Sequence, residues 1–128
     1  MLGCETRPEW QVARPEPATA AGLQATRDLL RRGGERPQAL LAAGDAIAIG
    51  VLRALQEGGV AVPGGIAVTG FDDLPLADAL NPALTTIRQP VAELARTAFA
   101  WVAGTGTPPA GGAPQVLLPG ELIVRESA

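Results

Sequence analysis

The chain has 128 residues, a length that suits one domain with a single core and excludes two full-sized domains. Hydrophobic residues make up 47% of it and charged residues 18%, which is typical of a globular protein. Its basic residues are all arginines scattered along the chain, and 13 acids bring the net charge to −3. This balance argues against a nucleic-acid-binding surface in this chain, because such a surface needs clustered positive charge.

The chain contains one cysteine, Cys4, and no histidine. An internal disulfide is therefore excluded, and the residues of the usual zinc sites and Cys-His nucleophiles are missing. We expect no metal and no other cofactor. No apolar run reaches the length of a transmembrane helix, and the first residues lack the order of a secretory signal. These features predict a cytoplasmic location without membrane contact.

The first half of the chain alternates between helical and apolar extended patterns. A short strand candidate at residues 10–13 lies between prolines. Small and apolar side chains then recur at helical spacing, which predicts a helix over residues 18–32. Residues 39–43 are wholly apolar and are bounded by proline and glycine, as is typical of a strand buried on both faces.

The next helix is predicted over residues 45–58, opened by Asp45 and ended by a pair of glycines. A second apolar strand follows at 66–69, and the sequence Gly-Phe-Asp-Asp at 70–73, the GFDD corner, closes it. Helix, strand, helix and strand with short connections predict parallel strands joined by right-handed crossovers. The chain is therefore assigned to the α/β class.

The second half is interrupted by prolines and glycines. Residues 84–89 form an extended segment, and Pro90 begins a helix predicted to run to about residue 103. A loop rich in glycine, proline and threonine follows. Two short strands, at 115–118 and 121–124, are predicted to close the chain.

Two acids follow the two predicted parallel strands, at the edge where ligands bind in open α/β sheets. Asp45 comes after residues 39–43, and Asp72 comes after residues 66–69. A carboxylate there can accept two hydrogen bonds from neighbouring hydroxyls, which is how sugars are held. Asp45 is also placed to cap the helix behind it, and Asp72 to form the turn; for Asp45 both roles can coexist. Asp73 is assigned to the turn or to capping.

Paired carboxylates also hydrolyse glycosides, so Asp45 and Asp72 raise the question of catalysis. No other acid with a motif around it lies on the same predicted edge. The chain has no GxGxxG or GxxxxGK[ST] sequence, and its only serine, Ser127, is in the tail. We therefore expect no enzymatic activity, and a carboxylate-dependent glycosidase is the less favoured alternative.

Three motifs occur in a specific order: GFDD at 70–73, PALTTIRQP at 82–90 and LLPGELIVR at 117–125. The run from residue 40 to residue 94 resembles the C-terminal part of the effector-binding domain of LacI-type transcriptional repressors. The closing segment is similar to the final strand pair of that family. With the helix at 18–32, the resemblance covers nearly the whole chain.

The resemblance implies a periplasmic-binding-protein-like fold, a three-layer open parallel sheet of which this chain supplies an incomplete C-terminal subdomain. Residues 10–83 and 115–125 would form the elements of that subdomain. Residues 84–103 would form a crossover segment and a helix that packs on an N-terminal subdomain. We expect that subdomain, the helix-turn-helix headpiece and the first strand of the C-terminal subdomain to be absent from this chain.

The resemblance also assigns roles to single residues. Asp72 matches the effector-contacting acid of the family, and Asp45 matches the acid of an Asn-Asp pair whose Asn is replaced here by Gly44. The family pairs into dimers largely through this half of the molecule. By position, the dimer interface would comprise Ala46, Ile49, Arg53, Leu76 and Leu80. Leu76 and Leu80 can instead cover the sheet edge.

These inferences predict the effector-sensing and dimerisation portion of a LacI-family transcriptional regulator. It would bind a sugar or a related polyol, act as a homodimer, and contact DNA only through the absent headpiece. The effector would favour one angle between the two subdomains over another. The alternative is a truncated fragment that dimerises or interferes without binding a ligand.

Overall fold

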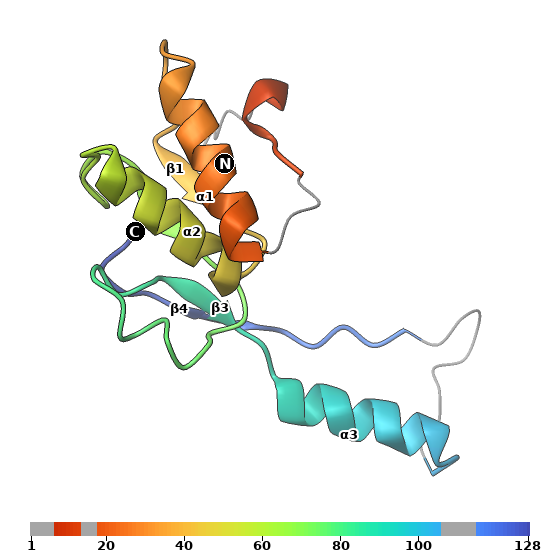
Figure 1. The fold of residues 1–128 in the computed structure, drawn as a ribbon. Coiled ribbons are helices and arrows are strands. Elements are labelled where there is room, and N and C mark those ends of the chain that lie inside the picture. Colours follow the sequence, from red (N-terminus) through yellow and green to blue (C-terminus); the bar gives the residue numbers. More distant parts are fainter. Residues whose placement is uncertain (1–6, 14–17, 106–114) are drawn as a thin grey trace, which may run out of the picture.

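The computed structural model describes residues 7–13, 18–105 and 115–128. Cys4 and most of the predicted loop after residue 103 lie outside the described residues. The elements, in chain order, are η1 (Pro8–Trp10), α1 (Ala18–Arg31), β1 (Ala39–Leu41), α2 (Asp45–Glu57), β2 (Ala67–Thr69), β3 (Thr86–Arg88), α3 (Val91–Val102) and β4 (Glu121–Ile123) (Figure 1).

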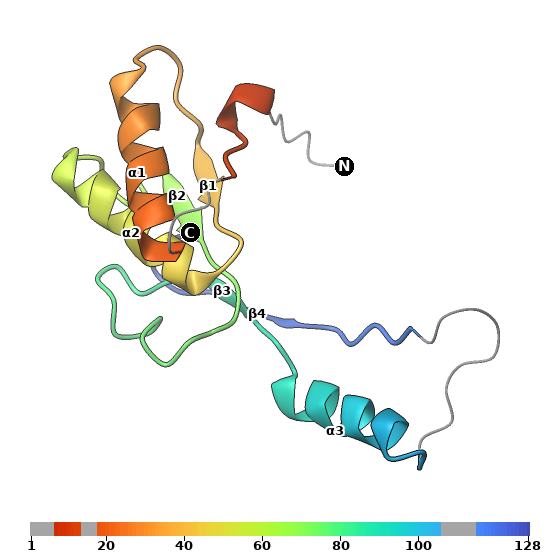
Figure 2. The same ribbon diagram turned by 45° about the vertical axis from the view of Figure 1, so that its right-hand side comes forward.

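Helices α1 and α2 follow the predicted boundaries to within one residue, and both lie on the same side of β1 and β2 (Figure 2). Gly50 of α2 permits this close contact. A Cβ atom at position 50 would collide with the backbone oxygen of Thr19 in α1. At the other end of the pair, Nη2 of Arg27 in α1 lies 2.7 Å from Oε2 of Glu57 in α2.

Strands β1 and β2 pair in parallel, with Ala39 opposite Ala67 and Leu41 opposite Thr69. The predicted parallel arrangement is therefore confirmed. The predicted burial of β1 on both faces is wrong, because α1 and α2 cover only one face of this strand pair. On the other face the Leu41 side chain is 81% exposed.

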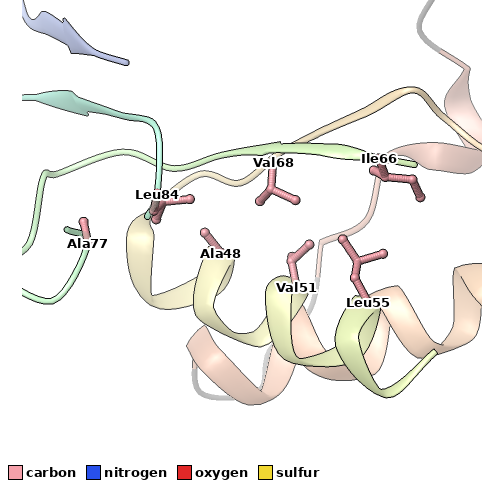
Figure 3. Packing of buried hydrophobic residues seen from close by; sticks show 7 residues of the cluster. All are labelled: Ala48, Val51, Leu55, Ile66, Val68, Ala77 and Leu84. Carbon is pink, nitrogen blue, oxygen red and sulfur yellow. The ribbon is translucent and has the colours of Figure 1, made fainter. Parts of the chain in front are cut away.

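The hydrophobic core lies between α2 and the sheet (Figure 3). Its α2 side chains recur three or four residues apart, as expected for one face of a helix. Leu55 is fully buried, and burial of such a side chain contributes roughly 1.5–3 kcal/mol to folding. The buried cluster consists of Ala48, Val51, Leu55, Ile66, Val68, Ala77 and Leu84.

Strands β3 and β4 pair antiparallel, with Thr86 opposite Ile123. The buried Ser127 attaches this pair to the core. Its hydroxyl donates to the Val68 carbonyl (2.6 Å) and accepts from the Thr85 amide (2.9 Å). The Val68 amide in turn donates to the Ser127 carbonyl (2.8 Å). These bonds hold β3 beside the carboxyl end of β2, and we call β3 and β4 the crossover strands.

Two of the predicted strands are wrong. Residues 8–10 form a 3-10 helix that begins at Pro8, and the Arg7 guanidinium lies 4.7 Å from the Trp10 ring. Residues 115–118 form no strand, because only Glu121–Ile123 reaches a described partner strand, β3. A short apolar run becomes a strand only where a neighbour supplies hydrogen bonds.

Helix α3 stands apart from the other elements in both views (Figures 1 and 2). None of its 12 described residues is buried, and Phe99 and Val102 are 73% and 89% exposed. Residues 115–118 lie along one side of it, where they share a shallow hollow with Leu94 and Trp101. The helix therefore has an apolar surface that the described chain leaves largely open.

Candidate functional site

The two acids predicted for the site lie at the same end of the parallel strands. Asp45 follows β1 and Asp72 follows β2, and the parallel register brings the two connections together. The Asp45 amide donates to the Phe71 carbonyl (2.8 Å), which joins the start of α2 to the GFDD corner. The carboxyl edge of β1 and β2 is therefore the candidate site.

Asp45 is buried, with 1% of its surface exposed, and both of its carboxylate oxygens are used inside the chain. Oδ1 accepts from the Thr86 hydroxyl (2.6 Å), and Oδ2 accepts from the Leu74 amide (2.8 Å). The predicted capping role of Asp45 is wrong, because Gly44 is the N-cap residue and Asp45 is the first residue of α2. Its charge still lies at the favourable end of the helix dipole.

Asp72 is exposed at the tip of the corner. Its Oδ1 accepts a hydrogen bond from Nε2 of Gln89 (2.6 Å), and its amide donates to the Ile87 carbonyl (2.9 Å). The backbone of Asp72 has a φ of 115°, a sparsely populated region that costs a non-glycine residue about 1–3 kcal/mol. The corner is thus held in a strained conformation that presents a carboxylate to solvent.

Gly44 adjoins this carboxylate. A Cβ atom at position 44 would lie 3.3 Å from Oδ2 of Asp72, which is closer than ordinary van der Waals contact. Glycine therefore leaves the Oδ2 side of Asp72 uncovered. The resemblance predicts an asparagine at this position, so the replacement by Gly44 removes a side-chain amide next to Asp72.

Asp73 makes contacts that the sequence did not reveal. Its Oδ2 lies 2.7 Å from Nε of Arg88 in β3, and its Oδ1 lies 2.7 Å from Nη2 of Arg125, just after β4. Hydrogen bonds from two guanidinium groups, first that of Arg125 and second that of Arg88, hold the pKa of the Asp73 carboxyl below its ordinary value. Arg88, Gln89 and Arg125 all lie within the recognised motifs, but the motif spacing does not show which strands pair.

The predicted dimer residues differ in exposure. Arg53 on α2 is exposed, and its Nε lies 3.1 Å from Oε1 of Glu57. Leu76, which follows the GFDD corner, is 52% exposed. Leu80 is partly buried and packs against the core, which fits the alternative that it covers the sheet edge. Ala46 and Ile49 are half-buried on the same helix.

Within the described ranges, no group of three or more cysteine, aspartate or glutamate side chains is arranged to hold a metal ion. Over the same ranges, every helix is too short or too polar to cross a bilayer. The side chains at the candidate site offer carboxylate and amide groups for hydrogen bonds.

A family model described as the periplasmic binding protein-like domain matches residues 2–128. The lactose operon repressor of Rhizobium radiobacter is 53% identical over 55 residues, which are 43% of this chain and 49% of that protein. The ribose operon repressor of Escherichia coli K12 is 46% identical over 78 residues, which are 61% of this chain and 23% of that protein. Both relatives are named as operon repressors.

Among solved structures, a sugar-binding transcriptional regulator of the LacI family from Escherichia coli, complexed with phosphate, matches with a TM-score of 0.77. It is 33% identical, and the match covers 96% of this chain and 44% of that one. The chain thus spans less than half the length of each of these three relatives. The predicted fold is confirmed: the chain belongs to the periplasmic binding protein-like domain family, as part of the effector-binding domain of a LacI-type regulator.

Proposed function

We propose that this chain is the effector-sensing and dimerisation portion of a LacI-family regulator, and that its effector is a sugar or a related polyol. The observation that carries the proposal is the exposed carboxylate of Asp72. One of its oxygens is held by Gln89, and the side of the other is left uncovered by Gly44. A carboxylate of this kind accepts hydrogen bonds from neighbouring sugar hydroxyls. The names of the lactose and ribose operon repressors also favour a sugar.

In this proposal, Asp45 has a structural role: it is buried beneath the site and stabilises it through internal hydrogen bonds. Direct contact of Asp45 with an effector stays a prediction, and its burial and two internal hydrogen bonds disfavour it. The Asp45 carboxylate accepts hydrogen bonds from Leu74, just after the GFDD corner, and from Thr86 in β3. It thereby fixes the position of the corner that carries Asp72. It performs no chemistry, and the glycosidase alternative has no further support from the described residues.

The regulatory step in this proposal needs a second lobe. Residues 84–103 would lead to it, and the apolar side chains of α3 would pack on it. The exposure of Phe99 and Val102 supports this arrangement, as does the greater length of the relatives. Effector binding would then favour one angle between the lobes, and a DNA-binding headpiece elsewhere in the longer protein would respond.

The homodimer is proposed to form through α2 and the segment after the corner, with Ala46, Ile49, Arg53 and Leu76 at its surface and Leu80 behind them. Light scattering coupled to size exclusion should give a dimer, and Leu76→Asp should shift it to a monomer. Leu117→Asp, at a side chain that is 85% exposed near α3, is the matched control and should leave the dimer intact. A monomeric native chain would overturn the dimer proposal.

Sugar binding is tested by an NMR titration of the chain with lactose and with D-ribose. Because one wall supplies only part of the contacts, we expect affinities in roughly the millimolar range, with shifts at Asp72 and Gln89. Asp72→Asn should weaken binding by roughly tenfold or more, while Asp78→Asn, another exposed acid, should not. The proposal fails if neither sugar shifts these resonances. Cleavage of lactose that depends on Asp45 and Asp72 would instead favour the glycosidase alternative.

A further inference from the structure

The two acids of the GFDD corner are tied to two consecutive residues of the chain around β3. Oδ1 of Asp72 accepts from Gln89 (2.6 Å), and Oδ2 of Asp73 accepts from Arg88 (2.7 Å). Both acids have left-handed backbones, with φ values of 115° and 53°. Non-glycine residues persist in such conformations only where surrounding contacts hold them. The shape of the corner therefore depends on its contacts with the crossover strands.

Asp73 contributes the strongest of these contacts. Its side chain is only 9% exposed, and its two oxygens are shared between two arginines, Arg88 and Arg125. Hydrogen bonds between ionised partners are roughly twice as strong as those between neutral groups. Since both oxygens are already engaged, Asp73 is poorly placed to bind a ligand itself.

The two arginines are themselves anchored to the crossover strands. Arg125 also donates from Nη1 to the Leu84 carbonyl (2.8 Å), just before β3. Arg88 lies in β3 and donates from Nη1 to Glu121 of β4 (3.2 Å). Asp73 thus connects the corner to both strands, and β3 leads directly into α3.

We propose that Asp73 is a positioning residue: its two arginine bridges hold Asp72 toward the effector and join the corner to the crossover strands. This inference rests on the proposed function, because it assigns Asp73 a part in effector sensing. A displacement of Asp72 by the effector would reach β3 and β4 through the same bridges. Asp73 touches no effector in this mechanism.

The test compares hydrogen exchange at two amides of the same protein. The Asp72 amide donates to Ile87 in the crossover, and the Val68 amide donates to Ser127 in the core. Asp73→Asn should speed exchange at Asp72 by roughly ten- to a hundredfold and leave exchange at Val68 unchanged. An unchanged rate at Asp72, or equal acceleration at both amides, would overturn the proposal.

Glu57→Gln is the matched control. Glu57 also bridges two arginines, Arg27 and Arg53, but at the opposite end of α2 from the corner. Its removal should leave exchange at Asp72 as it is in the native chain. Acceleration at Asp72 by this variant would show that the loss of any such bridge loosens the corner, which contradicts a specific role for Asp73.

Arg88→Gln keeps the test decisive if Asp73→Asn does not fold. This variant removes one of the two bridges to Asp73, together with the contact of Arg88 with Glu121, and should speed exchange at Asp72 to a smaller extent. Lactose titration of the same variants forms a separate arm, in which weaker binding is expected without contact between the sugar and Asp73. If the native chain binds no sugar, the proposed function fails, while the exchange rates still decide the positioning role.

Discussion

Helices α2 and α3 have similar apolar patterns in the sequence but differ in burial in the structure. Six residues of α2 are buried, whereas none of the 12 described residues of α3 is buried. The apolar side of α2 packs on a facing surface within the chain, whereas α3 shares a shallow hollow with residues 115–118 and has no buried residue among those described. An amphipathic pattern therefore predicts a helix, but its stability depends on a partner surface.

The largest expected effect is the loss of a core side chain from α2. Leu55→Ala should lower the free energy of unfolding by about 2–5 kcal/mol, because Leu55 is fully buried and its removal leaves a cavity. Phe99→Ala, on α3, should change it by less than about 0.5 kcal/mol. Urea unfolding followed by circular dichroism measures both. Equal losses would mean that α3 is packed in solution.

The second largest expected loss of stability comes from the contact between α1 and α2. Gly50→Ala should cost about 1–3 kcal/mol, since the added Cβ collides with the backbone of α1 at Thr19. Gly64→Ala is the control, because the nearest atom to a Cβ there lies 4.0 Å away. A tolerated alanine at position 50 would show that the two helices can separate without loss.

Substitution of Asp45 and of Asp72 should have different effects on stability in urea unfolding. Asp45→Asn should destabilise the chain by about 1–3 kcal/mol, because two buried hydrogen bonds to a carboxylate, from the Leu74 amide and the Thr86 hydroxyl, are exchanged for weaker bonds to a neutral amide. Asp72→Asn should change stability little, since this side chain is exposed. Comparable stability of the two variants would contradict the buried supporting role of Asp45.

The smallest expected effect is the dependence of stability on pH. A carboxyl whose pKa is lower in the folded state stabilises the fold above its unfolded pKa, near 4, and this contribution is lost as the pH falls through the folded pKa. The pKa of Asp73 is lowered by Arg125 and Arg88, so stability should fall below about pH 4. Asp73→Asn should flatten this fall in urea unfolding series. Glu57→Gln should flatten it less, because Glu57 is 38% exposed against 9% for Asp73.

The sequence predicted the parts of the fold that depend on local patterns. Helical spacing gave α1 and α2, and two apolar runs gave the parallel pair β1 and β2. Residues 10–13 and 115–118 were wrong as strands, because pairing depends on neighbours that local composition does not specify. The burial of β1 on both faces was wrong for the same reason, as Leu41 shows.

The sequence predicted where the two acids of the candidate site lie, but not which of them is buried or what they contact. Strand order put Asp45 and Asp72 at one edge, yet it did not show that Asp45 points into the core and Asp72 toward solvent. The bridge from Asp73 to Arg125 joins residues 52 positions apart, and it exists because β3 and β4 pair antiparallel. Spacing along the chain carries no signal for such a contact.

Hydrogen exchange measured across the whole chain tests the central contrast most directly. The amides of α2 should be the slowest, since they open only with the core, and those of α3 should exchange faster by roughly a thousandfold. Protection of α3 equal to that of α2 would contradict the account, because it would show that the chain itself already covers the apolar surface assigned to a second lobe.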